Sequence, residues 1–306
     1  LERNDIGGST RDRYVFAMPK AIEPVGQSRN DFDIFDELAG RLDCREAFSK
    51  GRDEEAWLQW IYQGIVDKAV QQGVSMPDFD EFWEQGYWLA PETREDDVLF
   101  GPFRADPEAN PLATPSKKIE LFSETIAAFD YDDCPPHPAW MKPAEWLGDD
   151  KAKAFPFHLI TNQPRARLHS QMDAGPLSRA QKINGREPVW INPADAEGKG
   201  IAEGDVVRLF NERGACLAGA VITDRVRPGV IVLATGAWFD PLDMNTPGSL
   251  EKHGNPNVLT LDKGTSRLAQ GCAALSALVQ VEKFDGTPPP VTAFEPPHLL
   301  TPEETR

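Results

Sequence analysis

The sequence of 306 residues has no long apolar run, no excess of basic residues and only four cysteines. No apolar run is longer than five residues, whereas a membrane-spanning helix needs about 20, so a transmembrane helix is excluded. Lys and Arg number 32 against 49 Asp and Glu, which gives a net charge of −17. So acidic a chain argues against nucleic acid as a partner, because phosphate binding requires a basic face.

The cysteines and histidines show no spacing typical of metal ligands. The cysteines are far apart and form no C-x-x-C pair, so they indicate neither a zinc site nor a redox motif. They are buried or free thiols, or include a disulfide. We therefore expect no metal ligand in this chain. The residues concerned are Cys44, Cys134, Cys216, Cys272, His137, His158, His169, His253 and His298.

Charge and length divide the chain into two halves. Residues 1–150 hold 15 Lys and Arg against 32 Asp and Glu, whereas residues 151–306 hold 17 of each. A length of 306 residues is about twice that of a typical domain, so we expect two domains with these bounds. The acidity is that of a solvated surface or of a docking face for a basic redox partner. Because the chain starts at Leu1, we also expect it to be part of a longer polypeptide.

The first half shows helical periodicity between long loops. Apolar side chains recur at helical spacing over residues 31–43 and 54–72, and a shorter helix is expected over 78–85. Residues 117–122 (KKIELF) predict a strand, and Ser123 can cap a helix over 124–129. So long an irregular stretch is unusual in an independent domain, which indicates the helical, loop-rich end of a larger α/β domain.

The second half changes to short strands and turns. Asn192 and Pro193 are typical of the first turn of a helix. Six short strands with one or two small helices predict a closed β-barrel, so the expected fold class is α+β. The expected strands cover residues 155–161, 188–191, 205–210, 216–223, 230–234 and 275–281.

Residues 161–186 combine basic and amide side chains directly after the first expected strand. Five Lys and Arg residues stand there against a single acidic residue, Asp173. Such a loop offers donors to an anionic ligand with hydrogen-bonding edges, for example a pyrophosphate and a purine. The alternative is a solvated loop whose arginines pair with the acidic first half.

Two further polar segments lie next to expected strands. Residues 235–240 contain Gly236 and Trp238, and residues 255–270 contain several amides and hydroxyls. Gly236 would permit close approach of a ligand to the backbone, whereas Trp238 also fits plain core packing. Because each polar segment adjoins a strand of one barrel, we expect the three to converge on one rim.

Four long stretches carry a resemblance to a known family. In order they are TNQPRARLHSQ, INGREPVWINPADAEGKGIAEGDVVRLFNERG, RPGVIVLATGAWFDP and NPNVLTLDKGTSRLAQG. Together they resemble the C-terminal domain of the dimethyl sulfoxide reductase family of molybdenum oxidoreductases, in its biotin sulfoxide and trimethylamine N-oxide reductase branch. ERNDIGG, RNDFDIFDELA, CPPHPAWMKPAEW and TAFEPP extend the resemblance over nearly the whole chain.

The resemblance implies a fold and a cofactor. In that family the C-terminal domain is a double-psi β-barrel, which closes over a bis-molybdopterin guanine dinucleotide cofactor with its molybdenum. Gln163 departs from the pattern of the nearest branch, in which a histidine is expected at that position. Matched residue by residue, the resemblance implies cofactor contacts from Asn162, Gln163, Arg167, His169, Ser170, Gln171, Gly236, Trp238, Asn257 and Gln270.

The resemblance also implies a function. The parent protein would reduce a small-molecule S-oxide or N-oxide by oxygen atom transfer, with an electron-donor protein and upstream domains of the same polypeptide as partners. The family's metal-ligating serine belongs to the upstream part, so we assign no catalytic residue here and expect this chain to be inactive alone. The alternative is a non-catalytic double-psi barrel that serves as a binding or adaptor module. We expect a soluble protein, in the periplasm or the cytoplasm.

Overall fold

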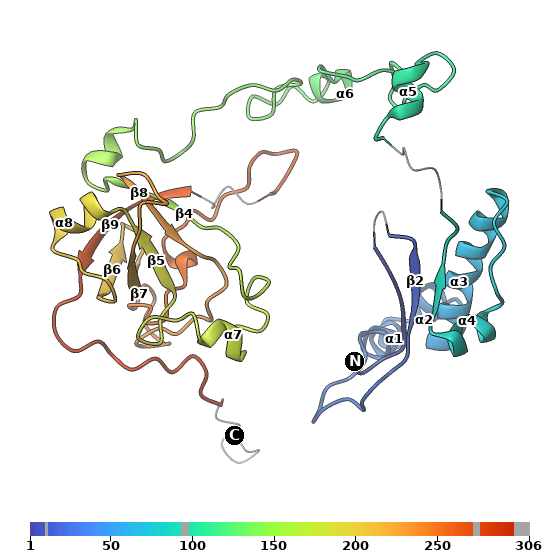
Figure 1. Ribbon diagram of the computed structural model, residues 1–306, viewed down its shortest axis with the longest axis horizontal. Helices are drawn as coiled ribbons and strands as arrows, with labels where there is room; N and C mark the ends of the chain where they lie inside the picture. Colours follow the sequence, from blue (N-terminus) through green and yellow to red (C-terminus); the bar gives the residue numbers. More distant parts are fainter. Residues whose placement is uncertain (10–11, 93–97, 272–275, 297–306) are drawn as a thin grey trace. The chain divides into compact units, whose positions relative to one another are not determined.

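The computed structural model describes residues 1–9, 12–92, 98–271 and 276–296 (Figure 1). Its contacts divide the chain into two compact units, Leu1–Lys118 and Ile119–Arg306. Residues 119–150 belong to the second unit by these contacts, and the domain boundary expected at residue 150 stays a prediction. None of the helices in these described ranges is long and apolar enough to cross a membrane.

The longer helices of the first unit begin where the sequence caps them. The side chains of Asn30, Asp53 and Asp78 each accept a hydrogen bond from a backbone N–H in the first turn of a helix. The helices expected over 31–43, 54–72 and 78–85 are thereby confirmed. The helices of this unit are α1 (Asp31–Arg41), α2 (Arg45–Ser49), α3 (Glu54–Gln71), α4 (Phe79–Gln85) and α5 (Gly101–Ala105).

The first unit also contains a three-stranded antiparallel sheet that the sequence pattern did not reveal. Its strands are β1 (Asp5–Gly8), β2 (Tyr14–Met18) and β3 (Tyr87–Leu89). A small core joins this sheet to the helices, since Ala17 of β2 packs with Tyr62 of α3 and Phe82 of α4, whose rings stack 4.5 Å apart. The strands are short, and β3 pairs with a strand about 70 residues before it, so local patterning could not identify them.

The strand expected over residues 117–122 is wrong, because this stretch consists of bends and irregular backbone. Lys117 has a φ of 61°, and the hydroxyl of Thr114 donates to the carbonyl of Lys118, so the backbone is bent back on itself. The next prediction is confirmed. Ser123 accepts a hydrogen bond from Ile126 N at the start of α6 (Glu124–Ala127).

The second unit is built on a closed barrel of six strands in the order β4-β8-β5-β7-β6-β9 (Figure 1). β4 pairs with β8, and β5 with β7, in parallel; the remaining neighbours are antiparallel. This arrangement confirms the expected fold class, an α+β chain with a six-stranded double-psi barrel. The strands are β4 (Phe157–Ile160), β5 (Pro188–Ile191), β6 (Val206–Phe210), β7 (Ala215–Ile222), β8 (Val230–Leu233) and β9 (Ser276–Lys283).

Alternate side chains of every strand fill the barrel interior, where Leu159, Ile191, Leu209 and Ile231 are fully buried. Asn192 accepts from Ala194 N at the start of its helix, as expected. Short helical turns connect the strands. They are η1 (Asp150–Lys153), α7 (Pro176–Arg179), α8 (Pro193–Lys199) and η2 (Pro256–Val258).

A buried carboxylate ties the segment before the barrel to the barrel itself. Glu145 accepts hydrogen bonds from Arg213 (2.7 and 2.9 Å), Lys151 (2.6 Å) and Leu278 N (2.8 Å). Burial alone would raise the pKa of Glu145, but these donors lower it to about 2. Arg213 also donates to the carbonyl of Leu259, so this group of contacts fixes the start of the loop that carries Gln270.

The cysteines in the described part of the chain are free thiols. Cys216 is fully buried in the barrel, Cys134 is half-buried and Cys44 is exposed. Cys272, like residue 275 of the last expected strand and His298, lies outside the described residues.

Candidate functional site

The loop that follows β4 packs directly on the segment that follows β8. Gly236, with a φ of 89°, lies so close to this loop that a Cβ there would be 1.9 Å from the carbonyl oxygen of His169. Thr235 N donates to the carbonyl of Asn162, and Arg167 donates to the carbonyl of Thr235. The close backbone approach at Gly236 is therefore made by the chain's own loop.

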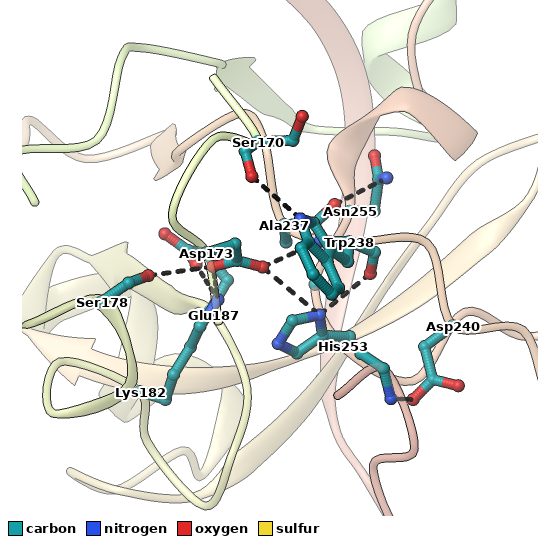
Figure 2. A network of polar contacts seen from close by, with 12 residues as sticks. Ser170, Asp173, Ser178, Lys182, Glu187, Ala237, Trp238, Asp240, His253 and Asn255 are labelled. Atoms are coloured by element: carbon teal, nitrogen blue, oxygen red, sulfur yellow. Dashed lines mark hydrogen bonds and ion pairs between the residues drawn. The ribbon is translucent and has the colours of Figure 1, made fainter. Parts of the chain in front are cut away.

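Trp238 connects the same two segments through its side chain and its backbone. Its indole Nε1 donates to the carbonyl of Ser170 at 2.8 Å, and its backbone N–H donates to Asp173 at 2.9 Å (Figure 2). The ring of Phe294 packs 5.7 Å from its own ring. With 39% of its surface exposed, Trp238 lies at the rim of the unit.

The loop forms a turn that displays three polar side chains. His169 and Met172 both have left-handed backbone conformations, with φ of 50° and 63°, which non-glycine residues seldom adopt. Gln163 supports the turn, because its Oε1 accepts from His169 N at 3.2 Å and its Nε2 lies 3.1 Å from His169 Nδ1. As a result, His169, Ser170 and Gln171 are exposed side by side.

Beneath the turn lies a cluster of four charged side chains, each at most 5% exposed. Arg167 contacts Asp173 (3.4 Å) and Glu187 (3.1 Å), and Lys182 contacts the same two carboxylates (2.8 and 2.7 Å). Burial would raise the pKa of Asp173, but Lys182, the N–H of Trp238 and Arg167 together lower it. Two of the five cations in residues 161–186 are therefore paired inside the protein.

The remaining cations of residues 161–186 differ in exposure. Arg186 is buried and donates to the carbonyls of Asn184 and Pro289. Arg165 and Arg179 are exposed, and neither forms an ion pair with any residue that the structure describes. The exposed part of the loop thus offers two cations together with amides and a hydroxyl, a donor set that fits an anionic ligand with hydrogen-bonding edges.

A groove of about 390 Å³ adjoins this loop on the barrel wall. Its lining includes Asn162, Gln163 and Arg165 from the loop. Trp190 and Arg225 also line it, with the guanidinium of Arg225 4.5 Å from the centre of the indole ring. The groove therefore combines a flat aromatic wall with positive charge.

The third polar segment joins this site only in part. Asn255 donates to the carbonyl of Ala237 at 2.9 Å (Figure 2). Asn255 also accepts from Asn257 N, so it connects the exposed Asn257 to the Trp238 segment. Gln270 instead donates to Ser266 and lines a second cavity of about 480 Å³. Within the described ranges, no hydrogen bond joins Gln270 to the other expected site residues.

Two buried ionisable groups, Glu251 and His253, contact the backbone of the Trp238 segment and of the residues near it. Glu251 accepts from the backbone N–H groups of Asp240, His253, Gly254 and Asn255 at 2.7 to 3.2 Å. Burial raises the pKa of Glu251 to about 7, although these donors oppose the rise. Burial and the charge of Lys182 lower the pKa of His253 to about 4, so the ring is neutral.

His253 lies under the carbonyl of Trp238, which is 2.9 Å from its Nδ1 (Figure 2). Sequence reasoning missed His253 and Glu251 as site residues, because neither stands in a motif. Asp173 did carry a signal, as the single acid among five bases. Among the described residues, no group of three His, Cys, Asp or Glu side chains could hold a metal ion.

Comparison with known proteins identifies the family. Residues 157–277 match the family described as "Molydopterin dinucleotide binding domain". The chain is 46% identical over 299 residues to the dimethyl sulfoxide/trimethylamine N-oxide reductase of Cereibacter sphaeroides, and 48% identical over 287 residues to the biotin sulfoxide reductase of the same organism. The chain belongs to the dimethyl sulfoxide reductase family.

These relatives of the dimethyl sulfoxide reductase family are much longer than the chain. The two alignments cover 97% and 94% of this chain but only 36% and 38% of the two reductases. Among solved structures, acetylene hydratase from Pelobacter acetylenicus superimposes with a TM-score of 0.64 at 18% identity, over 92% of this chain and 37% of that one. This likeness supports the fold alone. The exposed turn, the Trp238 segment and the buried charges all lie within the matched residues 157–277.

Proposed function

We propose that the barrel unit binds bis-molybdopterin guanine dinucleotide and that the protein containing this chain reduces S-oxides or N-oxides by oxygen atom transfer. The observation that carries the proposal is the braced turn at residues 169–171, whose side chains are exposed within the segment matching the dinucleotide-binding family. The names of the related reductases support the substrate class.

The cofactor contacts divide into direct and indirect ones. His169, Ser170 and Gln171, together with Asn162 and Gln163, would hold the cofactor directly, because their side chains are exposed. The exposed guanidinium groups of Arg165 and Arg179 would offset the charge of its pyrophosphates. The proposed contacts also include Asn257 and Gln270.

Other proposed site residues would act through the loop. The side chain of Arg167 is 3% exposed and donates to the carbonyls of His169 and Thr235, so it would hold the turn in place. Gly236 would make room for the turn, and Trp238 would fasten it at Ser170. When bound, the cofactor supplies two-electron chemistry at its metal, whereas this chain supplies orientation and charge.

The rest of the polypeptide would supply what this chain lacks. We place the dinucleotide-binding domain at residues 151–306 and assign residues 1–150 to the end of a larger catalytic domain. The residue that ligates molybdenum and the surface that meets an electron-donor protein would lie outside this chain. The isolated chain would then have no reductase activity, which an assay of the purified chain with a reduced dye and an S-oxide checks.

The proposal is tested by measuring molybdenum and acid-released guanine per polypeptide in the purified holoenzyme. We expect about one metal and two guanines, and a lower content of both in His169→Ala and Arg167→Ala. His137→Ala, at an exposed histidine that stacks on Phe122 outside the barrel, is the matched control and should keep full content. A folded holoenzyme with neither metal nor guanine would favour a non-catalytic binding module.

A further inference from the structure

The exposed turn at residues 169–172 has a backbone conformation that contacts with the surrounding residues must stabilise. His169 and Met172, three residues apart, both have positive φ. Such backbone states cost free energy in non-glycine residues and persist only where surrounding contacts impose them. The residue that imposes them is therefore important for any ligand that the turn binds.

Asp173 follows the turn and is fully buried at the meeting point of four segments. Its Oδ1 accepts from Lys182 at 2.8 Å and from Ser178 at 2.9 Å, and lies 3.4 Å from Arg167 Nε. Its Oδ2 accepts from Trp238 N at 2.9 Å (Figure 2). One carboxylate thus connects the turn to α7, to the segment before β5 and to the segment after β8.

The neighbours of Asp173 transmit this connection to the turn itself. Arg167, held by Asp173 and Glu187, donates to the carbonyl of His169 at 3.1 Å. Trp238, held by Asp173 through its backbone, donates to the carbonyl of Ser170 at 2.8 Å. The carbonyls of two of the three displayed residues, His169 and Ser170, are therefore fixed by groups that Asp173 itself holds.

We propose that Asp173 is a positioning residue for the cofactor. Through its hydrogen bond with the N–H of Trp238, Asp173 holds the turn at residues 169–171 in the conformation that binds the cofactor. This inference rests on the proposed function, since it names the group that prepares the same site. Asp173 does not touch the ligand. It holds the turn in one conformation before the ligand binds, so that binding costs less conformational entropy.

The charge of Asp173 must be separated from its hydrogen bond in any test. Removing Asp173 alone leaves two buried cations against Glu187, which would destabilise the fold whatever the role of the loop. Replacing Lys182 by methionine at the same time restores the charge balance between Arg167 and Glu187. Buried ion pairs replaced together by apolar side chains often leave stability unchanged.

The decisive comparison uses two double variants of the holoenzyme. Asp173→Leu with Lys182→Met removes the acceptor for Trp238 N–H, whereas Asp173→Asn with Lys182→Met removes the same charges but keeps a carbonyl oxygen that can accept it. The measurement is the rate at which guanine is lost after dilution, with thermal unfolding measured in parallel.

We expect the leucine pair to lose guanine about tenfold faster than the wild type, as for the loss of one hydrogen bond to a charged group. The asparagine pair should stay within about twofold of the wild type. Equal rates in the two pairs, whether fast or slow, would overturn the role of the Trp238 bond. If leucine does not fit, Asp173→Ala with Lys182→Met makes the same comparison without added volume.

A second variant tests the link from Trp238 to the turn. Trp238→Phe removes the indole N–H that bonds Ser170, and we expect it to accelerate guanine loss as well. Trp146→Phe is its matched control, because the buried Nε1 of Trp146 has no hydrogen-bond partner among the described residues. Equal rates in these two variants would contradict the proposal. A wild-type holoenzyme without guanine would overturn the proposed function together with this inference, whereas guanine-loaded variants with wild-type rates would overturn the inference alone.

Discussion

The two units of this chain differ in how much of their apolar surface they bury themselves. The barrel surrounds a continuous core to which every strand contributes, with Leu159, Leu209 and Ile231 fully buried. In the first unit, the buried apolar cluster consists of Ala17, Tyr62 and Phe82 with partly buried neighbours. The comparison shows that a closed sheet surrounds a continuous core, whereas the helices on a three-stranded sheet bury only a small one.

The helices of the first unit leave apolar side chains exposed. Phe35 of α1 and Leu42, at the C-cap of α1, are 54% and 66% exposed, and Trp60 of α3 is 55% exposed. Soluble surfaces rarely gather large apolar side chains in this way unless another surface covers them. The first unit therefore depends more than the barrel on the few core contacts it has, and substitutions can test this difference.

The largest effect is expected from truncating the core of the first unit. Phe82→Ala should cost about 3–5 kcal/mol, because it removes a fully buried ring that stacks on Tyr62. Hydrogen exchange should show protection lost throughout α3 and α4, while the strands of the barrel stay protected.

The matching change in the barrel is Leu209→Ala, with an expected cost of about 2–5 kcal/mol. Because the remaining core is continuous, the strands should keep measurable protection. If both variants kept protected amides to the same extent, the contrast between the two units would be refuted.

A smaller effect, of about 3 kcal/mol, is expected from acid titration of His253. Burial holds the pKa of His253 at about 4 in the folded barrel, against 6.5 ordinarily. Since the unfolded chain takes up the proton first, the stability that the neutral ring contributes is present above pH 6.5 and is lost as the pH falls toward 4. Urea unfolding of the barrel at several pH values should show this loss in the wild type and not in His253→Gln.

Glu251 has the opposite dependence and serves as the internal reference. Its pKa of about 7 means that its contribution is present below pH 4.5 and is lost as the pH rises toward 7. Both proteins contain Glu251, so its effect cancels when their curves are subtracted. Parallel curves for wild type and His253→Gln would show that His253 does not titrate in this range.

The smallest effect on stability is expected from the exposed face of α1. Phe35→Ser and Leu42→Ser should change the free energy of unfolding by about 0.5 kcal/mol or less, since both side chains are already largely in water. The same changes should reduce the binding of a hydrophobic dye to the chain. A loss of several kcal/mol would mean that α1 buries this face within its own unit.

Local patterns were sufficient to predict the elements that the sequence marks at their ends. Caps such as Asn30 and Asn192, and continuous apolar runs such as residues 230–234, are signals contained in a few neighbouring residues. The sheet of the first unit was missed, because β2 and β3 become strands only by pairing across 70 residues. Residues 117–122 had an apolar pattern typical of a strand, but the turn at Lys117 prevents one.

The candidate site was predictable in its location and not in its internal order. The polar segments around Asn162, Gly236 and Asn257 are joined by hydrogen bonds, as their positions next to barrel strands had indicated. Which cations face the solvent could not be read from the sequence. Arg165 and Arg167 are two residues apart, and only the fold shows that the second is paired with buried carboxylates.

The contact between Glu145 and Arg213 bears on how this barrel can be moved between proteins. The matched family segment begins at residue 157, yet the carboxylate that neutralises Arg213 and receives Leu278 N comes from 12 residues earlier. A recombinant fragment cut at residue 157 would leave that guanidinium without its counter-ion and the Leu278 amide without its acceptor. A fragment designed for grafting the barrel into another protein should therefore include residues 145–156.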